Sequence, residues 1–183
     1  MITLITDRLI CKKSLLVKIE ELINEKRIDQ IILREKDLDD EKLYNLYLEI
    51  EKITKNSHVN LIVNTSLAFA KKYDLKKIHL SQRNFKKLST KKALKDLSFG
   101  ISVHSMKEIK SALKFEPDYL IVSPVFKTDC KRGQKPLGIG FLKEVQSNTN
   151  IPLIALGGIN DEKINQLKQL NINNMAMRSY LLL

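Results

Sequence analysis

Cysteine is scarce in this chain of 183 residues: Cys11 and Cys130 are the only two, and they lie far apart in no metal-ligand spacing. Long apolar runs are also missing, because the longest is far shorter than the roughly 20 residues of a membrane-spanning helix. No secretory segment precedes the first apolar run. We therefore expect a reduced, cytoplasmic protein that has no membrane partner.

Aromatic residues make up only 6% of the sequence, although its charge is strongly positive. Lysine and arginine number 32 against 21 aspartate and glutamate, which gives a net charge of +11. No aromatic platform or groove-reading motif accompanies this charge, so we rank nucleic-acid binding last among the functions considered. Small anionic substrates remain as possible partners of this charge. The simplest interpretation of the lysines on the expected helix faces is a solvated surface. These lysines are Lys12, Lys13, Lys71, Lys72, Lys86, Lys87, Lys91 and Lys92.

Short runs with strand character alternate with helical segments along the whole chain. The runs are 2–6, 28–35, 59–64, 77–81, 97–104, 119–126, 151–158 and 173–180. Several are almost continuously apolar, which is typical of parallel strands covered on their outer face. Helical spacing is clearest in one stripe of Leu15, Leu16, Ile19, Leu22 and Ile23, and Ser105, Asn160 and Asp161 are candidate N-caps. The alternation predicts an α/β fold, a (β/α)8 TIM barrel that occupies residues 1–183 as a single domain.

The barrel is expected to be short. An open, doubly wound sheet is the alternative, but no glycine-rich nucleotide loop follows the first run. The sequence ends soon after the eighth run, so we expect the eighth helix to be missing or vestigial. The leucines at 181–183 would then cover the outer face of the eighth strand or meet a partner subunit, and a homodimer is one way to bury them.

Function in such a barrel sits where the strands end. The expected ends gather positive charge that suits phosphate or diphosphate, from Arg34, Lys36, Arg83, Lys131 and Arg178. Gly157 and Gly158 follow the seventh run, where bare backbone N–H groups could approach an anion. Plainer interpretations exist for several of these residues: a turn at the glycines, an ion pair between Arg34 and Glu35, hydrogen-bonding roles for His79 and His104, and a small packing residue at Cys130.

Several motifs, in this order, resemble the thiamine phosphate synthase/TenI family over residues 2–180. They are LREK, IVN, IHLSQ, GISVHS, DYLIVSPVFKTDCKRG, PLGIGFL and IPLIALGGIN. The resemblance implies a barrel that joins hydroxymethylpyrimidine diphosphate to thiazole phosphate. In TenI-type members it implies a barrel that tautomerises the thiazole phosphate instead.

The resemblance also assigns residues to ligands. It places Arg34, Lys36 and Asn64 on the diphosphate, with Ser102 and Lys131 facing the same leaving group. It places Thr128, Gly158 and Ser179 on the thiazole phosphate, beside Gly157 and Arg178 on the same rim. The substrates are therefore expected to be small phosphate esters.

The chain departs from the family pattern where synthases hold Mg²⁺. Thr65 stands in place of an aspartate, and Arg83 and Asn84 stand in place of an acidic pair. A hard cation needs oxygen ligands, preferably carboxylates. We therefore expect no metal site and no cofactor, with Mg²⁺ needed only if the protein is a synthase.

The two activities of the family leave three hypotheses for this chain. The TDCK sequence at 128–131 is like TenI, and His104, Cys130 and Lys131 are the candidate catalytic residues, so a TenI-like tautomerase is favoured. Pro124, however, stands where TenI enzymes carry a catalytic histidine. The first alternative is thiamine-phosphate synthase, and the second is a regulatory protein that binds phosphate ligands without catalysis.

Overall fold

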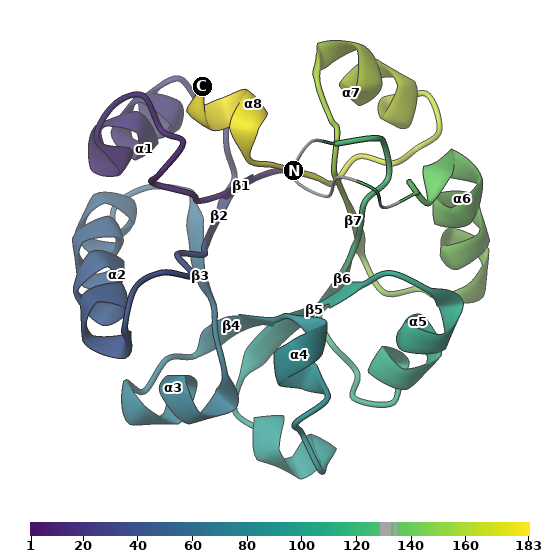
Figure 1. The fold of residues 1–183 in the computed structure, drawn as a ribbon, viewed down its shortest axis with the longest axis horizontal. Coiled ribbons are helices and arrows are strands. Elements are labelled where there is room, and N and C mark those ends of the chain that lie inside the picture. The colour runs from purple at the N-terminus through teal and green to yellow at the C-terminus, as the bar shows by residue number, and fades with distance from the viewer. Residues whose placement is uncertain (129–132, 134) are drawn as a thin grey trace.

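The protein is a closed barrel of parallel strands in the order β1 to β8 (Figure 1). The computed structural model describes residues 1–128, 133 and 135–183. The strands are β1 (Ile2–Ile5), β2 (Gln30–Leu33), β3 (Asn60–Asn64), β4 (Lys77–Leu80), β5 (Ser98–Val103), β6 (Tyr119–Val122), β7 (Leu153–Leu156) and β8 (Met175–Met177). β8 pairs with β1, which places Met177 opposite Leu4 and closes the ring. The predicted TIM barrel is confirmed, and the open sheet is excluded.

Helices surround the barrel and connect its strands (Figure 1). They are α1 (Leu15–Asn24), α2 (Asp40–Thr54), α3 (Leu67–Lys72), α4 (Gln82–Phe85), the 3₁₀ helix η1 (Lys91–Leu94), α5 (Met106–Leu113), α6 (Gly138–Asn148), α7 (Asp161–Lys168) and α8 (Ser179–Leu182). Ser105 and Asn160 cap α5 and α7 as predicted, because each side chain accepts a backbone N–H three residues later. Asp161 is not a cap: it lies in the first turn of α7, where the helix dipole favours its charge.

Both faces of the strands are buried, which explains their continuous apolar runs. Ile31 and Ile32 are adjacent in β2, and they belong to different clusters: Ile31 packs with the helices and Ile32 packs inside the barrel. The helices contribute their apolar stripes to the outer cluster, as Leu15 and Ile19 do in α1. Each such side chain contributes about 1.5–3 kcal/mol when it is fully buried.

Only a short eighth helix lies within this sequence. α8 has four residues and lies near α1 (Figure 1). Leu181 and Leu182 are buried, but Leu183 is 61% exposed, so the last leucine is not buried within this chain and only the expected contact with a partner subunit would cover it. A homodimer that would cover Leu183 stays a prediction.

The predicted lysine faces are solvated, but only Lys71 and Lys72 of α3 and Lys91 and Lys92 of η1 lie in helices. The other four lysines lie just before α1 or just after α4. The eight lysines predicted to be exposed, Lys12, Lys13, Lys71, Lys72, Lys86, Lys87, Lys91 and Lys92, are all exposed. Across the described ranges, no helix is both long and apolar enough to cross a membrane.

Candidate active site

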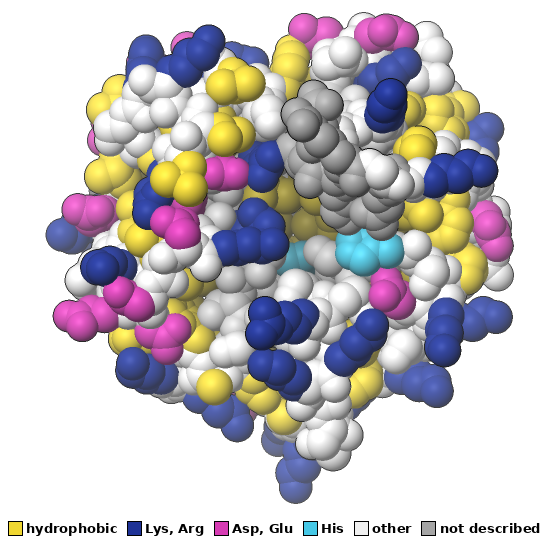
Figure 2. All heavy atoms as spheres, viewed as in Figure 1, with side chains coloured by type: hydrophobic (Ala, Val, Ile, Leu, Met, Phe, Trp, Pro, Cys, Tyr) yellow, Lys and Arg dark blue, Asp and Glu magenta, His cyan; other side chains and the backbone are white. Residues whose placement is uncertain are grey.

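The carboxyl ends of the strands form the rim at which the sequence predicts the site. One face of the molecule is hollowed near its middle, with lysine and arginine on one side of the hollow and histidine on the other (Figure 2). The predicted rim cations lie after β2 (Arg34 and Lys36), in α4 (Arg83) and directly after β8 (Arg178). Arg83 is exposed. Two predicted catalytic residues, Cys130 and Lys131, lie outside the described residues.

Glu35 fixes the loop that follows β1. The Arg8 backbone N–H donates to its carboxylate oxygens at 3.1 and 3.2 Å, and the Arg34 N–H donates to the Thr6 hydroxyl at 2.8 Å. Glu35 is only 5% exposed. Burial raises the pKa of Glu35 above its ordinary value, while hydrogen bonds from Thr6 and from the Arg8 backbone act against that rise. Glu35 therefore ties the ends of β1 and β2 together.

Asp7 joins the end of β1 to the end of β8. Its carboxylate accepts a hydrogen bond from the Arg178 guanidinium at 2.8 Å, and the two residues are 171 apart in sequence. Both side chains are partly buried, at 19% and 24% exposure. The sequence-based reasoning missed Asp7, although its position just beyond the first apolar run could have marked it as a rim residue.

Arg34, Lys36 and Arg178 share one electrostatic environment. The charge of Arg34 lowers the pKa of Lys36 most, followed by burial and then the charge of Arg178. Cations at neighbouring strand ends favour a bound anion, because the anion relieves their mutual repulsion. We call these three residues, together with Asp7, the cationic corner.

His79 is a structural residue inside the barrel. Its Nδ1 lies 3.2 Å from the Tyr119 hydroxyl, and its Nε2 lies 2.7 Å from the Ser102 hydroxyl. Burial lowers the pKa of His79 to about 3, with a smaller contribution from the charge of Arg34, so the ring is neutral. Gly100 makes room for this arrangement, since a Cβ there would overlap the Tyr119 ring. Ser102, predicted to face the leaving group, is held in place by His79.

His104 follows β5 and is half-buried. Its Nδ1 lies 2.6 Å from the Ser123 carbonyl oxygen, which can only accept, so Nδ1 carries the proton and Nε2 is left as a proton acceptor. The His104 backbone N–H donates to Glu108 at 2.8 Å, which fixes the start of α5. His104 therefore has a fixed ring orientation at a strand end.

Thr65 and Asn84, at two of the positions where synthases are expected to hold Mg²⁺, contact each other. The Asn84 side-chain amide donates to the Thr65 carbonyl oxygen at 2.9 Å, so these two residues bind each other. Within the described ranges, no group of three or more His, Cys, Asp or Glu side chains could hold a metal ion. Asn64 ends β3 beside them, and its side chain makes no hydrogen bond to any described residue.

Gly157 and Gly158 are required by close packing. Their φ angles are +108° and +65°, a region that favours glycine. A Cβ at Gly158 would overlap the Lys127 carbonyl oxygen, and one at Gly157 would lie 2.9 Å from the Pro124 Cβ. The sequence predicts that these glycines leave space for an anion, and that role stays a prediction. The structure shows that they also leave space for the segment after β6. Thr128, at the end of that segment, is half-buried, and Ser179 begins α8.

A family model described as thiamine monophosphate synthase matches residues 2–181 of the chain. The chain belongs to the thiamine monophosphate synthase family. A thiamine-phosphate synthase of Clostridium tetani is 31% identical over 180 residues, which cover 98% of this chain and 86% of that protein. A relative from Aquifex aeolicus is 36% identical over 160 residues, or 87% of this chain and 86% of its own length.

A solved structure confirms the fold of this family member. Thiamine phosphate pyrophosphorylase from Pyrococcus furiosus has a TM-score of 0.82, with 23% identity over 97% of this chain and 85% of that one. The sequence favoured a TenI-like tautomerase over a synthase. The names of the relatives favour the synthase, which was the first alternative.

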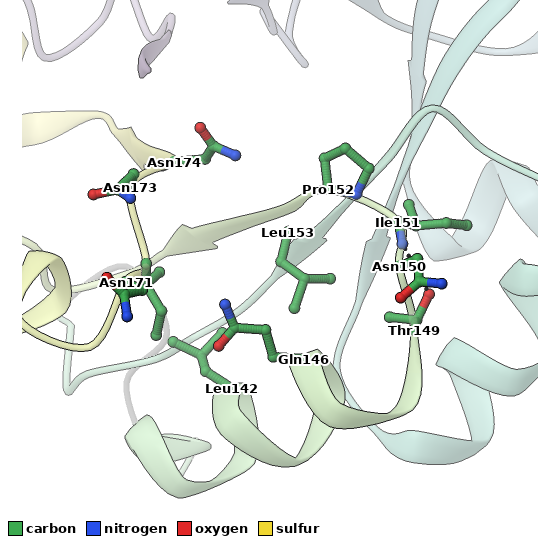
Figure 3. Close-up of a pocket in the computed structure, with 11 residues that line it drawn as sticks. Leu142, Gln146, Thr149, Asn150, Ile151, Pro152, Leu153, Asn171, Asn173 and Asn174 are labelled. Carbon is green, nitrogen blue, oxygen red and sulfur yellow. Dashed lines mark hydrogen bonds between the residues drawn. The ribbon is translucent and has the colours of Figure 1, made fainter.

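A cavity of about 270 Å³ lies at the other end of the barrel, where β7 and β8 begin (Figure 3). Gln146 of α6 points from one side toward the segment before β8, which carries Asn171 (Figure 3). The cavity is lined by amide, hydroxyl and apolar side chains, and none of its lining residues is charged. It therefore does not suit the phosphate esters of a thiamine monophosphate synthase, and the candidate site stays at the carboxyl ends of the strands.

Proposed function

We propose that this protein joins hydroxymethylpyrimidine diphosphate to thiazole phosphate and releases diphosphate. The observation that carries the proposal is the cationic corner, where Arg34 and Lys36 follow β2, Arg178 follows β8, and β1 pairs with both of these strands. A diphosphate leaving group takes the electron pair of the breaking bond and gains negative charge, which fixed cations stabilise. Tautomerisation of a thiazole phosphate releases no such group. The synthase names of relatives that align with 98% of the chain support the same reading.

In this reaction one group of residues would bind the diphosphate and another the thiazole phosphate. Arg34 and Lys36 would bind the diphosphate, and the uncommitted amide of Asn64 would donate to it. Gly158, Ser179 and Thr128 would hold the thiazole phosphate through backbone and hydroxyl groups, as the family resemblance implies. Lys131 would approach the leaving group from the loop after β6.

The residues at the family's magnesium positions do not fit the ion. Thr65, Arg83 and Asn84 offer no carboxylate, and the Asn84 amide nitrogen already donates to Thr65. We therefore assign no step of the reaction to Mg²⁺ bound by these residues.

A tautomerase is the second candidate, and His104 favours it. Its unprotonated Nε2 could move a proton at a carbon of the thiazole, because Nδ1 is committed to Ser123. Cys130 would be the other proton carrier in that reaction. The positive charge of the cationic corner would then have no part in the chemistry.

The two candidates are separated by incubating purified protein with both substrates together and with thiazole phosphate alone. We expect condensed product and diphosphate only when both substrates are present, measured by chromatography and by a diphosphate assay. Interconversion of thiazole tautomers, followed by NMR, without condensation would support the tautomerase instead. Binding of thiazole phosphate with neither reaction would support a non-catalytic binding protein.

A further inference from the structure

The loss of the family's metal-binding acids changes the charge of the site as well as its ligands. Carboxylates that hold Mg²⁺ are themselves negative, so without the ion they would repel a diphosphate. Thr65 and Asn84 are neutral, and Arg83 is positive. A diphosphate approaching these strand ends therefore meets no carboxylate at the positions where the ion would have been needed.

Three neighbouring strands bring charge to one place at the rim. β8 pairs with β1, and β1 pairs with β2, so Arg178, Asp7 and Arg34 follow consecutive strands. The cations Arg34, Lys36 and Arg178 stand against two carboxylates, Asp7 and Glu35, which leaves a surplus of one positive charge (3 − 2). Arg8, on the same loop, is paired with Asp37.

Asp7 is itself held from both sides. Its neighbour Thr6 accepts from the Arg34 N–H, and its neighbour Arg8 donates to Glu35. Its carboxylate is therefore a fixed anchor for the Arg178 guanidinium, 2.8 Å away. A guanidinium has five donors, so one guanidinium can bind a carboxylate and a phosphate oxygen at the same time.

We propose that Arg178, positioned by Asp7, is a third cationic ligand of the diphosphate, and that the cationic corner binds this group without a divalent ion. The inference rests on the proposed synthase function. Arg178 touches the ligand, whereas Asp7 acts through Arg178 and is a positioning residue. Lys36 is the electrostatic link, because its pKa is lowered by Arg34 and by Arg178.

Calorimetry with inorganic diphosphate, in excess EDTA and in Mg²⁺, tests the role of Arg178. Arg178→Gln should weaken diphosphate binding by roughly tenfold or more, because it removes a charge-assisted contact. Arg178→Lys keeps the charge and should weaken binding less than Arg178→Gln. Lys76→Gln is the matched control: it also removes one positive charge from an ion pair with an aspartate, but next to the amino end of β4. Melting temperatures of all variants confirm that they fold.

Asp7→Asn separates positioning from simple electrostatics. Removal of a negative charge alone would strengthen diphosphate binding, whereas loss of the anchor should weaken it. The weakening should vanish in the Arg178→Gln background, because the two residues act as one unit.

The inference is overturned if Arg178→Gln binds diphosphate like the parent, if Asp7→Asn binds it more tightly, or if EDTA abolishes binding. Any of these results with condensation activity intact would leave the proposed function standing. A parent protein that binds diphosphate as described but never condenses the two substrates would overturn the proposed function instead.

Discussion

Gly100→Ala tests whether the inside of the barrel holds the site in place. A Cβ at Gly100 would lie closer than 3.0 Å to three atoms of the Tyr119 ring, a separation that real Cβ atoms essentially never show. The Tyr119 residue is only 8% exposed, so the ring can relieve this overlap only by shifting within a packed interior. Such a shift would disturb the hydrogen bond between its hydroxyl and His79. Overpacking costs roughly 1–3 kcal/mol and a broken buried hydrogen bond roughly 1–3 kcal/mol more, which together predict a loss of about 2–6 kcal/mol.

Urea unfolding measures this loss, and Tyr119→Phe is the control because it removes only the hydroxyl. That variant should cost roughly 1–3 kcal/mol. In a Tyr119→Leu background the same Gly100→Ala change should cost far less, since the ring is gone. Condensation activity should also fall in Gly100→Ala, because His79 orients Ser102. A Gly100→Ala protein as stable as the parent would refute the packing argument.

Three further changes test other parts of the structure. Gly158→Ala should lower the melting temperature, because its φ is +65° and the new Cβ would overlap the Lys127 carbonyl oxygen. Gly140→Ala is the control: it lies in α6 with open space around it, and it should raise stability by up to about 1 kcal/mol. Equal melting temperatures of the two variants would contradict this prediction. His79 has a folded-state pKa of about 3 against 6.5 for a free histidine, so its stabilisation is present above pH 6.5 and is lost as the pH falls toward 3. Urea unfolding should show the parent losing about 2 kcal/mol more than His79→Gln between pH 7 and pH 5, and identical slopes would argue against a buried neutral ring. Replacing Thr65 and Asn84 together by aspartate should make diphosphate binding respond to Mg²⁺ in calorimetry; a variant that ignores Mg²⁺ would show that more than these two acids is missing.

The sequence was sufficient for the architecture because each strand and helix carries its own pattern. β2 carries the continuous apolar run Ile31–Leu33, and α1 has one apolar stripe, so neither depends on distant residues to be recognised. The cap at Ser105 is equally local, since its hydroxyl meets an N–H three residues away. These features follow from periodicity and hydrogen-bonding chemistry over a few residues.

The site was harder to predict because its contacts join segments that are far apart in the sequence. Asp7 meets Arg178 across 171 residues, and nothing near either residue in the sequence signals the partner. The close packing at Gly158 was not foreseen for a similar reason: its neighbour Lys127 comes from the segment after β6, which the pairing of β6 with β7 brings next to it. The preference for a tautomerase came from the TDCK motif and from the missing magnesium-binding acids, whereas the balance of charge depends on three strand ends at once.

The most direct test of the proposed function is the release of diphosphate by the parent protein in excess EDTA, with both substrates present. The account predicts one diphosphate for each condensed product, and no release when either substrate is omitted. Absence of diphosphate with EDTA and with Mg²⁺, from a folded protein that binds both substrates, would contradict it.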